Sequence, residues 1–238
     1  MMDLHAHDPR AVDVTKAIQK GEVDRLQQLL RDDPALATAG IVDAGGVRRS
    51  LLHVAADWPG HFPNGARTVA ALIAAGADPN AHVTTANANE TPLHWAASSD
   101  DVAVLDALLD GGADIEAPGA IFTGGPPMSD AVVFAQWNAA RRLLERGART
   151  TLWQAAALGL LDRVEQCFVE RQPSADEVTN AFWHACRGGQ RATAEFLLAR
   201  GANPNRVGHD GKTPLAAAQE SGHEELVAWL SEVARSRT

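Results

Sequence analysis

The chain has 238 residues, of which 45% are hydrophobic and 21% charged, and its formal net charge at pH 7 is −9. This composition is typical of a folded globular protein, and the negative net charge does not suit a surface that binds nucleic-acid phosphates. No stretch approaches the ~20 consecutive apolar residues that a membrane span needs, and residues 1–13 lack the apolar core of a signal peptide, so we expect a soluble, cytoplasmic protein with no nucleic-acid or membrane partner.

A repeated pattern of paired apolar residues runs along the chain, and its average spacing of about 33 residues is typical of repeat proteins. In chain order the pairs begin at Leu29, Leu72, Leu108, Leu143, Cys167 and Leu197, and Leu230 ends the series. We infer seven copies within a single domain over residues 1–238. They lie near residues 12–38, 49–81, 89–117, 125–149, 150–172, 180–205 and 210–234.

Each copy predicts two short helices joined by turns. In the sixth copy, Leu197 and Leu198 fall on the inner face of the second helix, and Gly201 supplies the left-handed residue that ends it. Before the last copy, Thr213 stands at a helix N-cap position and Pro214 at the first helical position, where the missing N–H costs nothing. Polar residues in the first and last copies predict capping repeats at both ends.

Four segments share a motif with a known family: TPLHWAA (91–97), AALIAAGADPNA (70–81), EFLLARGANPN (195–205) and DGKTPL (210–215). In these segments the chain resembles ankyrin-repeat proteins. The resemblance implies an all-α solenoid of about seven stacked helix-turn-helix repeats with short hairpin fingers. It also implies that the inner helices and fingers form a concave surface, which in this family usually binds another protein.

The chain departs from the family pattern in its connecting segments. The loop DWPGHFPNGA (57–66) lengthens one repeat. A loop with exposed aromatic side chains is either a binding element or a lid that packs on the neighbouring repeat. Its aromatic and imidazole side chains are Trp58, His61 and Phe62. The finger at 110–127 is rich in Gly and Pro and presents Ile121 and Phe122. No finger is expected between the fourth and fifth copies, so helix ends should form the middle of the surface.

The side chain at the fourth position of each repeat, counted from the threonine of the TPLH motif, is predicted to have a structural role. His53 and His94 match the histidine of the TPLH motif, and the resemblance implies that this histidine bonds between repeat backbones. Trp153 and Trp183 are assigned to the same position and are expected to pack between repeats, because large apolar side chains are usually buried.

The fifth position mixes ring and polar side chains, which the repeat offset should bring close together on neighbouring inner helices. These residues are Trp95, Asp130, Gln154 and His184. A buried, unpaired carboxylate is costly, so we expect Asp130 to be exposed on the concave side or paired with His184 or Arg187.

Together these features predict a partner-binding strip on the concave face. Its candidate residues are Asp57, Trp58, His61, Phe62, Trp95, Asp130, Phe134, Gln154, His184 and Arg187. Trp and Arg are favoured anchors at protein interfaces. We predict a monomeric, non-enzymatic module that binds an unidentified partner protein. The alternatives are a pocket for a small molecule or peptide, possibly catalytic, lined by Trp, Asp and His in the middle repeats, and a purely structural spacer.

No motif indicates a metal, a cofactor or a catalytic centre. The nine histidines are scattered without ligand spacing, and Cys167 and Cys186 cannot by themselves form a four-ligand zinc site. His5 and His7 form an HxH pair near a terminus that we expect to be frayed, and we attribute the pair to chance. The sequence contains no P-loop, no G-x-S-x-G and no dinucleotide-binding fingerprint. We therefore expect no catalytic residues, no metal and no cofactor.

Overall fold

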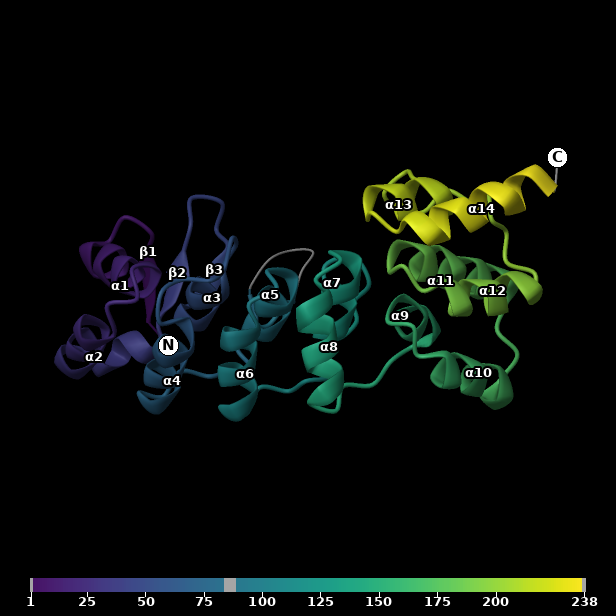
Figure 1. Cartoon of the computed structure of the whole chain (residues 1–238). Coiled ribbons are helices and arrows are strands. Elements are labelled where there is room, and N and C mark those ends of the chain that lie inside the picture. The colour runs from purple at the N-terminus through teal and green to yellow at the C-terminus, as the bar shows by residue number, and fades with distance from the viewer. Residues whose placement is uncertain (1, 84–88, 237–238) are drawn as a thin grey trace. The chain divides into compact units, whose positions relative to one another are not determined.

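The computed structural model describes residues 2–83 and 89–236. This part of the chain contains 14 α-helices, one 3₁₀ helix and three short strands (Figure 1). The α-helices follow one another as seven consecutive pairs, which confirms the predicted succession of helix-turn-helix units. The chain divides into two compact units, Met1–Ala148 and Arg149–Thr238, which are described in turn. The single domain over residues 1–238 stays a prediction.

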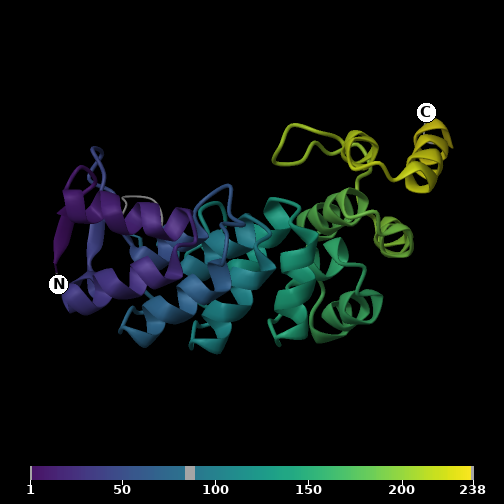
Figure 2. The same cartoon turned by 60° about the vertical axis from the view of Figure 1, so that its left-hand side comes forward.

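The first unit contains four helix pairs and the three strands. Its elements are β1 (Asp3–His5), α1 (Pro9–Gln19), α2 (Val23–Asp32), η1 (Pro34–Thr38), β2 (Gly40–Val42), β3 (Arg48–Ser50), α3 (Leu51–Ala56), α4 (Gly65–Ala74), α5 (Pro92–Ser98), α6 (Val102–Asp110), α7 (Pro127–Val133) and α8 (Trp137–Glu145). The first helices of successive pairs pack on one another, α1 on α3, α3 on α5 and α5 on α7, and so do the second helices, α2 to α8. Figure 2 shows these pairs side by side.

The second unit contains three helix pairs. Its elements are α9 (Leu152–Ala157), α10 (Leu161–Glu170), α11 (Ala175–Arg187), α12 (Arg191–Ala199), α13 (Pro214–Glu220) and α14 (Glu224–Ser236). Here α11 packs between α9 and α13, and α10 packs on α12. The layering of first helices on first helices is therefore the same in both units.

Local sequence signals set the helix ends. In four of the helix pairs, the first helix begins with a capping box. There the side chain of the cap residue accepts the backbone N–H of the third helical residue, and the side chain of that third residue accepts the backbone N–H of the cap residue. The cap residues are Ser50, Thr91, Thr151 and Ser174. Thr213 caps α13 with Pro214 in the first turn, as predicted. Gly201 has a φ of +91°, which confirms its predicted left-handed conformation after α12.

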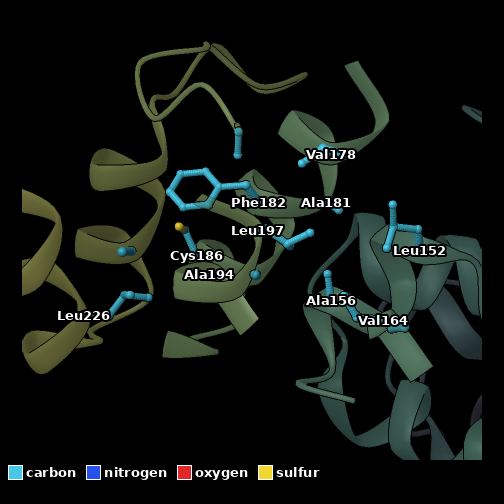
Figure 3. Packing of buried hydrophobic residues seen from close by; sticks show 14 of the residues in the cluster. Leu152, Ala156, Val164, Val178, Ala181, Phe182, Cys186, Ala194, Leu197 and Leu226 are labelled. Carbon is cyan, nitrogen blue, oxygen red and sulfur yellow. The ribbon is translucent and has the colours of Figure 1, made fainter. Parts of the chain in front are cut away.

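Small residues build the core of each unit. Adjacent alanines on the first helices are fully buried, such as Ala96 and Ala97 in the first unit and Ala155 and Ala156 in the second. Short side chains let helices approach closely, and each pair buries its apolar face only by stacking on its neighbours. In the second unit, Phe182 of α11 is the large central side chain of the cluster in Figure 3.

The N-terminal segment differs from the sequence-based expectation. Residues expected to be frayed instead form β1, which pairs in parallel with β2, and β2 pairs antiparallel with β3. Leu4 and Ile41 are buried side by side in this register, and their burial stabilises the sheet against the first helix pairs. His5 lies in β1, and no group of three or more potential metal-ligand side chains occurs among the residues that the structure describes.

Two features of the second unit concern where its helices begin. Only residues 146–151 separate α8 from α9, so the finger is missing there as predicted. By contrast, α11 is 13 residues long and begins before the predicted sixth repeat, because the capping box of Ser174 and Glu177 starts the helix early.

In residues 2–83 and 89–236, no helix is long and apolar enough to span a membrane.

Candidate functional site

The loop at 57–64 is fastened to the neighbouring repeats. The backbone N–H of His61 donates to Asp101 Oδ2 at 2.6 Å, and His61 Nε2 lies 3.1 Å from the carbonyl of Ser99. On the other side, the side-chain amide of Asn64 donates to the carbonyl of Gly21 at 3.0 Å. The loop is therefore held by the repeat before it and the repeat after it, and His61 acts as an anchor of the loop.

The same loop presents one large apolar side chain to solvent. Trp58 is 81% exposed, whereas Phe62 is half-buried. Asp57 forms an ion pair with Arg49 at 2.8 Å, and burial raises the pKa of its carboxyl despite this partner. Of the two aromatic residues predicted in this loop, Trp58 is the one whose exposure suits a direct contact with a partner.

His53 and His94 tie successive repeats together, which confirms their predicted structural role. In each ring Nδ1 accepts a backbone N–H, that of Ser50 or of Thr91, so the neutral ring carries its proton on Nε2. His53 Nε2 then lies 3.1 Å from the carbonyl of Glu90, and His94 Nε2 occupies the equivalent place in the next repeat. Burial lowers the pKa of both imidazoles to about 4, which keeps them neutral.

Two carboxyl groups lie together between α5 and α7. Asp130 is 1% exposed, and neither of its carboxyl oxygens has a hydrogen-bond partner among residues 2–83 and 89–236. Burial, and next the charge of Glu90, raise the pKa of Asp130 to about 8, and burial also raises the pKa of Glu90. Trp95 Nε1–H donates to Glu90 Oε2 at 3.2 Å. We call Glu90 and Asp130 the carboxyl pair.

The environment of Asp130 corrects the sequence-based expectation. The carboxyl group of Asp130 is not exposed and has no hydrogen-bond partner in the described part of the chain. The titratable group that faces it is Glu90, a residue that the sequence analysis did not single out. The signal that could have found Glu90 is its position immediately before Thr91, where the polypeptide leaves the finger and enters the inner helix.

An exposed apolar patch adjoins the carboxyl pair. Ile121 is 47%, Phe122 69% and Phe134 41% exposed, and the two phenyl ring centroids are 5.9 Å apart. The backbone N–H of Ile121 faces the Glu90 carboxylate and favours its charged form. Phe134 lies one helical turn after Asp130, and its N–H donates to the Asp130 carbonyl. We call Ile121, Phe122 and Phe134 the apolar patch.

In the second unit, aromatic and imidazole rings cluster around α11. His184 lies 4.6 Å from the Trp153 ring and 4.9 Å from the Trp183 ring, and burial lowers its pKa to about 3. Trp183 is buried and its indole N–H donates to the Lys212 carbonyl at 2.9 Å, which confirms packing between repeats. Arg187 lies over the Trp183 ring at 5.6 Å.

Gln154 has a structural role. It is buried and its Oε1 accepts the backbone N–H of Thr151 at 2.8 Å. It therefore caps α9 as His94 caps α5, although the sequence analysis assigned the equivalent position to Trp153. The difference arises because Thr151, and not Thr150, begins the helix.

Two pockets are found away from the predicted strip. One of about 290 Å³ is lined by residues that include Arg48, Ser50 and Asn80, and one of about 390 Å³ by residues that include Gln219 and His223. Neither contains any of the ten predicted binding residues, so these pockets give no support to the alternative of a Trp/Asp/His-lined pocket.

Comparison with known families decides the identity of the repeats. A family model described as ankyrin repeats matches residues 14–119, 52–152 and 152–236, which together cover most of the chain. The chain belongs to the ankyrin-repeat family. The recognition made from the TPLH-type motifs is thus confirmed, and with it the all-α solenoid architecture.

Individual ankyrin-repeat proteins are similar to this chain over different lengths. It is 29% identical over 140 residues to the ankyrin repeat and KH domain-containing protein mask-1 of Caenorhabditis elegans. That match covers 59% of this chain and 4% of the length of mask-1. The crystal structure of the human ASB11 ankyrin repeat domain matches with a TM-score of 0.53 and 22% identity, over 94% of this chain and 98% of that one. This second likeness shows the ankyrin fold.

Ankyrin repeats are in general protein–protein interaction modules, which makes a protein partner plausible for this chain. The ankyrin framework places Trp58, Trp95, the carboxyl pair and the apolar patch on or beside the first helices α3, α5 and α7 of the first unit. It places Gln154, His184 and Arg187 in the second unit.

Proposed function

We propose that this ankyrin-repeat chain is a non-enzymatic, cytoplasmic interaction module that binds a partner protein as a monomer. The partner contacts the surface of the first unit that contains Trp58, Trp95 and the apolar patch. We call this the α3–α5–α7 surface. The observation that carries the proposal is the exposure of large apolar side chains on a rigid framework.

Exposed aromatic residues in one region are a recognised feature of interaction sites. Single exposed apolar residues are ordinary on soluble proteins, whereas neighbouring ones mark binding surfaces. Here Phe122 and Phe134 contact each other while both remain exposed, and Trp58 stands on a loop anchored at both ends. Each such ring can bury about 150–250 Å² against a partner.

The test is affinity purification of the full chain from its source cells, with quantitative mass spectrometry of the proteins that follow it. Trp58→Ala and Phe122→Ala should each lower the affinity for the specific partner about 30-fold, which corresponds to about 2 kcal/mol for an anchor residue. The matched control is Val169→Ala, which truncates an exposed apolar side chain on α10 of the second unit.

Circular dichroism and thermal melting of each variant should match those of the parent chain, because neither Trp58 nor Phe122 is buried. Recovery of the same partner by both variants and the parent chain would refute the assignment to the α3–α5–α7 surface. Loss of the partner with Val169→Ala alone would place the contact on α10 instead.

A further inference from the structure

The carboxyl pair contains one carboxyl group that is buried without a hydrogen-bond partner. The indole N–H of Trp95 donates to Glu90, and the backbone N–H of Ile121 faces the same carboxylate. Asp130 is 1% exposed, its pKa of about 8 keeps it mostly protonated at pH 7, and neither of its oxygens has a hydrogen-bond partner among the residues that the structure describes. A buried polar group without a partner costs free energy, and buried carboxylates in proteins are normally paired with a cation or with several donors. Asp130 therefore lacks a partner that its chemistry calls for.

Within the described residues, no basic side chain of the chain fills this place. Neither Glu90 nor Asp130 takes part in any ion pair there, and Arg49 is engaged with Asp57. A metal ion is a poor candidate, because no group of three or more ligand side chains is found in residues 2–83 and 89–236. An organic cation from outside the chain needs fewer ligands and supplies its own N–H donors.

The neighbouring side chains suit a basic residue of a polypeptide. Glu90 and Trp95 are both half-buried, so a carboxylate and an indole ring remain reachable from solvent at the same place. Carboxylates and indole faces both attract guanidinium and ammonium groups. The apolar patch begins next to this place, because the backbone N–H of Ile121 faces Glu90 and Phe134 follows Asp130 by one helical turn. The chain as a whole carries a net charge of −9, which favours a basic partner.

We propose that the partner inserts an arginine or lysine side chain against the carboxyl pair and Trp95, and places an adjacent apolar side chain on the apolar patch. This inference rests on the proposed function, since it names the kind of partner that the α3–α5–α7 surface binds. Glu90 makes the direct contact because it is the reachable member of the carboxyl pair. Asp130 is buried beside it and, with a pKa of about 8, is mostly protonated at pH 7, so it acts through Glu90 as a positioning residue.

The test is selection of a library of random 12-residue peptides displayed on phage against the immobilised full chain. Enriched peptides should carry a basic residue next to an aromatic or aliphatic one. Their affinities are then measured by fluorescence anisotropy with the parent chain and with Glu90→Gln and Asp130→Asn. Both variants keep the shape of the side chain. Glu90→Gln removes a charge, and Asp130→Asn replaces the unpartnered carboxyl group of the core by an amide.

Glu90→Gln should weaken binding at least about tenfold, and so should replacing the basic residue of the peptide by glutamine. Combining the two changes should cost little more than either alone, because both remove the same contact. Asp130→Asn should weaken binding less. The matched control, Glu145→Gln, removes an exposed carboxylate of α8 that pairs with Arg142, and should leave the affinity unchanged.

Three outcomes separate this inference from the proposed function. Peptides that need Trp58 or Phe122 but no basic residue would overturn the inference and leave the proposed function standing. Peptides with a basic residue that bind Glu90→Gln as tightly as the parent chain would also overturn the inference. A library that yields no peptide dependent on Trp58, Phe122 or Glu90 would count against both.

Discussion

Replacing Asp130 by asparagine should stabilise the first unit, and by an amount that grows with pH. The carboxyl has an ordinary pKa of 3.8 and a pKa of about 8 in the folded protein, because it is buried beside Glu90. A group whose pKa is raised on folding holds its proton longer in the folded state, so between pH 3.8 and 8 the unfolded state is favoured increasingly as pH rises. Each pH unit is worth about 1.4 kcal/mol, which gives about 4 kcal/mol at pH 7.

Urea unfolding of the parent chain and of Asp130→Asn, followed by circular dichroism and tryptophan fluorescence between pH 4 and 9, measures this difference. The two proteins should be close in stability near pH 4, and the variant should gain steadily up to about pH 8, above which the difference levels off. Groups that titrate equally in both proteins cancel in the comparison. A difference that does not change with pH, or a variant that is less stable at pH 8 than at pH 5 relative to the parent, would refute the described environment of Asp130.

Three further substitutions test other parts of the fold. His94→Ala should lower the free energy of unfolding of the first unit by about 3 kcal/mol in urea titration, because it leaves the backbone N–H of Thr91 and the carbonyl of Gly125 without their partner. His94→Gln should recover part of this loss, because a glutamine at the equivalent position caps α9. Gly208→Ala should lower the free energy of unfolding by about 2 kcal/mol and alter the fluorescence of Trp183, because a β-carbon at this position would overlap the indole ring. An unchanged melting temperature would contradict that packing. Asp106→Asn should destabilise by about 1 kcal/mol at pH 7, and this difference should shrink as the solution is made acidic. Burial raises the pKa of this carboxyl, but hydrogen bonds from Arg142 and Arg146 outweigh burial and lower the pKa, so the contribution of the charged group to stability is lost as pH falls.

The helix pairs and their ends could be predicted from the sequence because they depend on local signals. The Thr213–Pro214 start and the left-handed Gly201 each involve residues within one turn of a helix end, and the 33-residue spacing repeats them. The histidines at the TPLH position follow the same logic, since His94 bonds its own helix cap. In each case the residues that form the contact are close together in the sequence, so the sequence pattern alone predicts the contact.

The remaining features depend on residues far apart in the sequence. The pairing of Leu4 with Ile41 joins segments about 35 residues apart, and no local pattern marks a strand of three residues. The approach of Glu90 to Asp130 likewise depends on how α5 packs on α7. The capping role of Gln154 was missed for a smaller reason: the cap residue of α9 is Thr151, one place after the residue on which the motif had been aligned.

The fastening of the 57–64 loop has a consequence for the kinetics of association. Because His61 and Asn64 fix the loop when the chain folds, its conformational entropy is lost then and not on meeting a partner. A partner that reaches Trp58 docks on a preformed surface, with no disorder-to-order step to slow the encounter. A substitution at Asp101 that releases His61 will therefore lower the association rate constant, although it removes no atom from the interface.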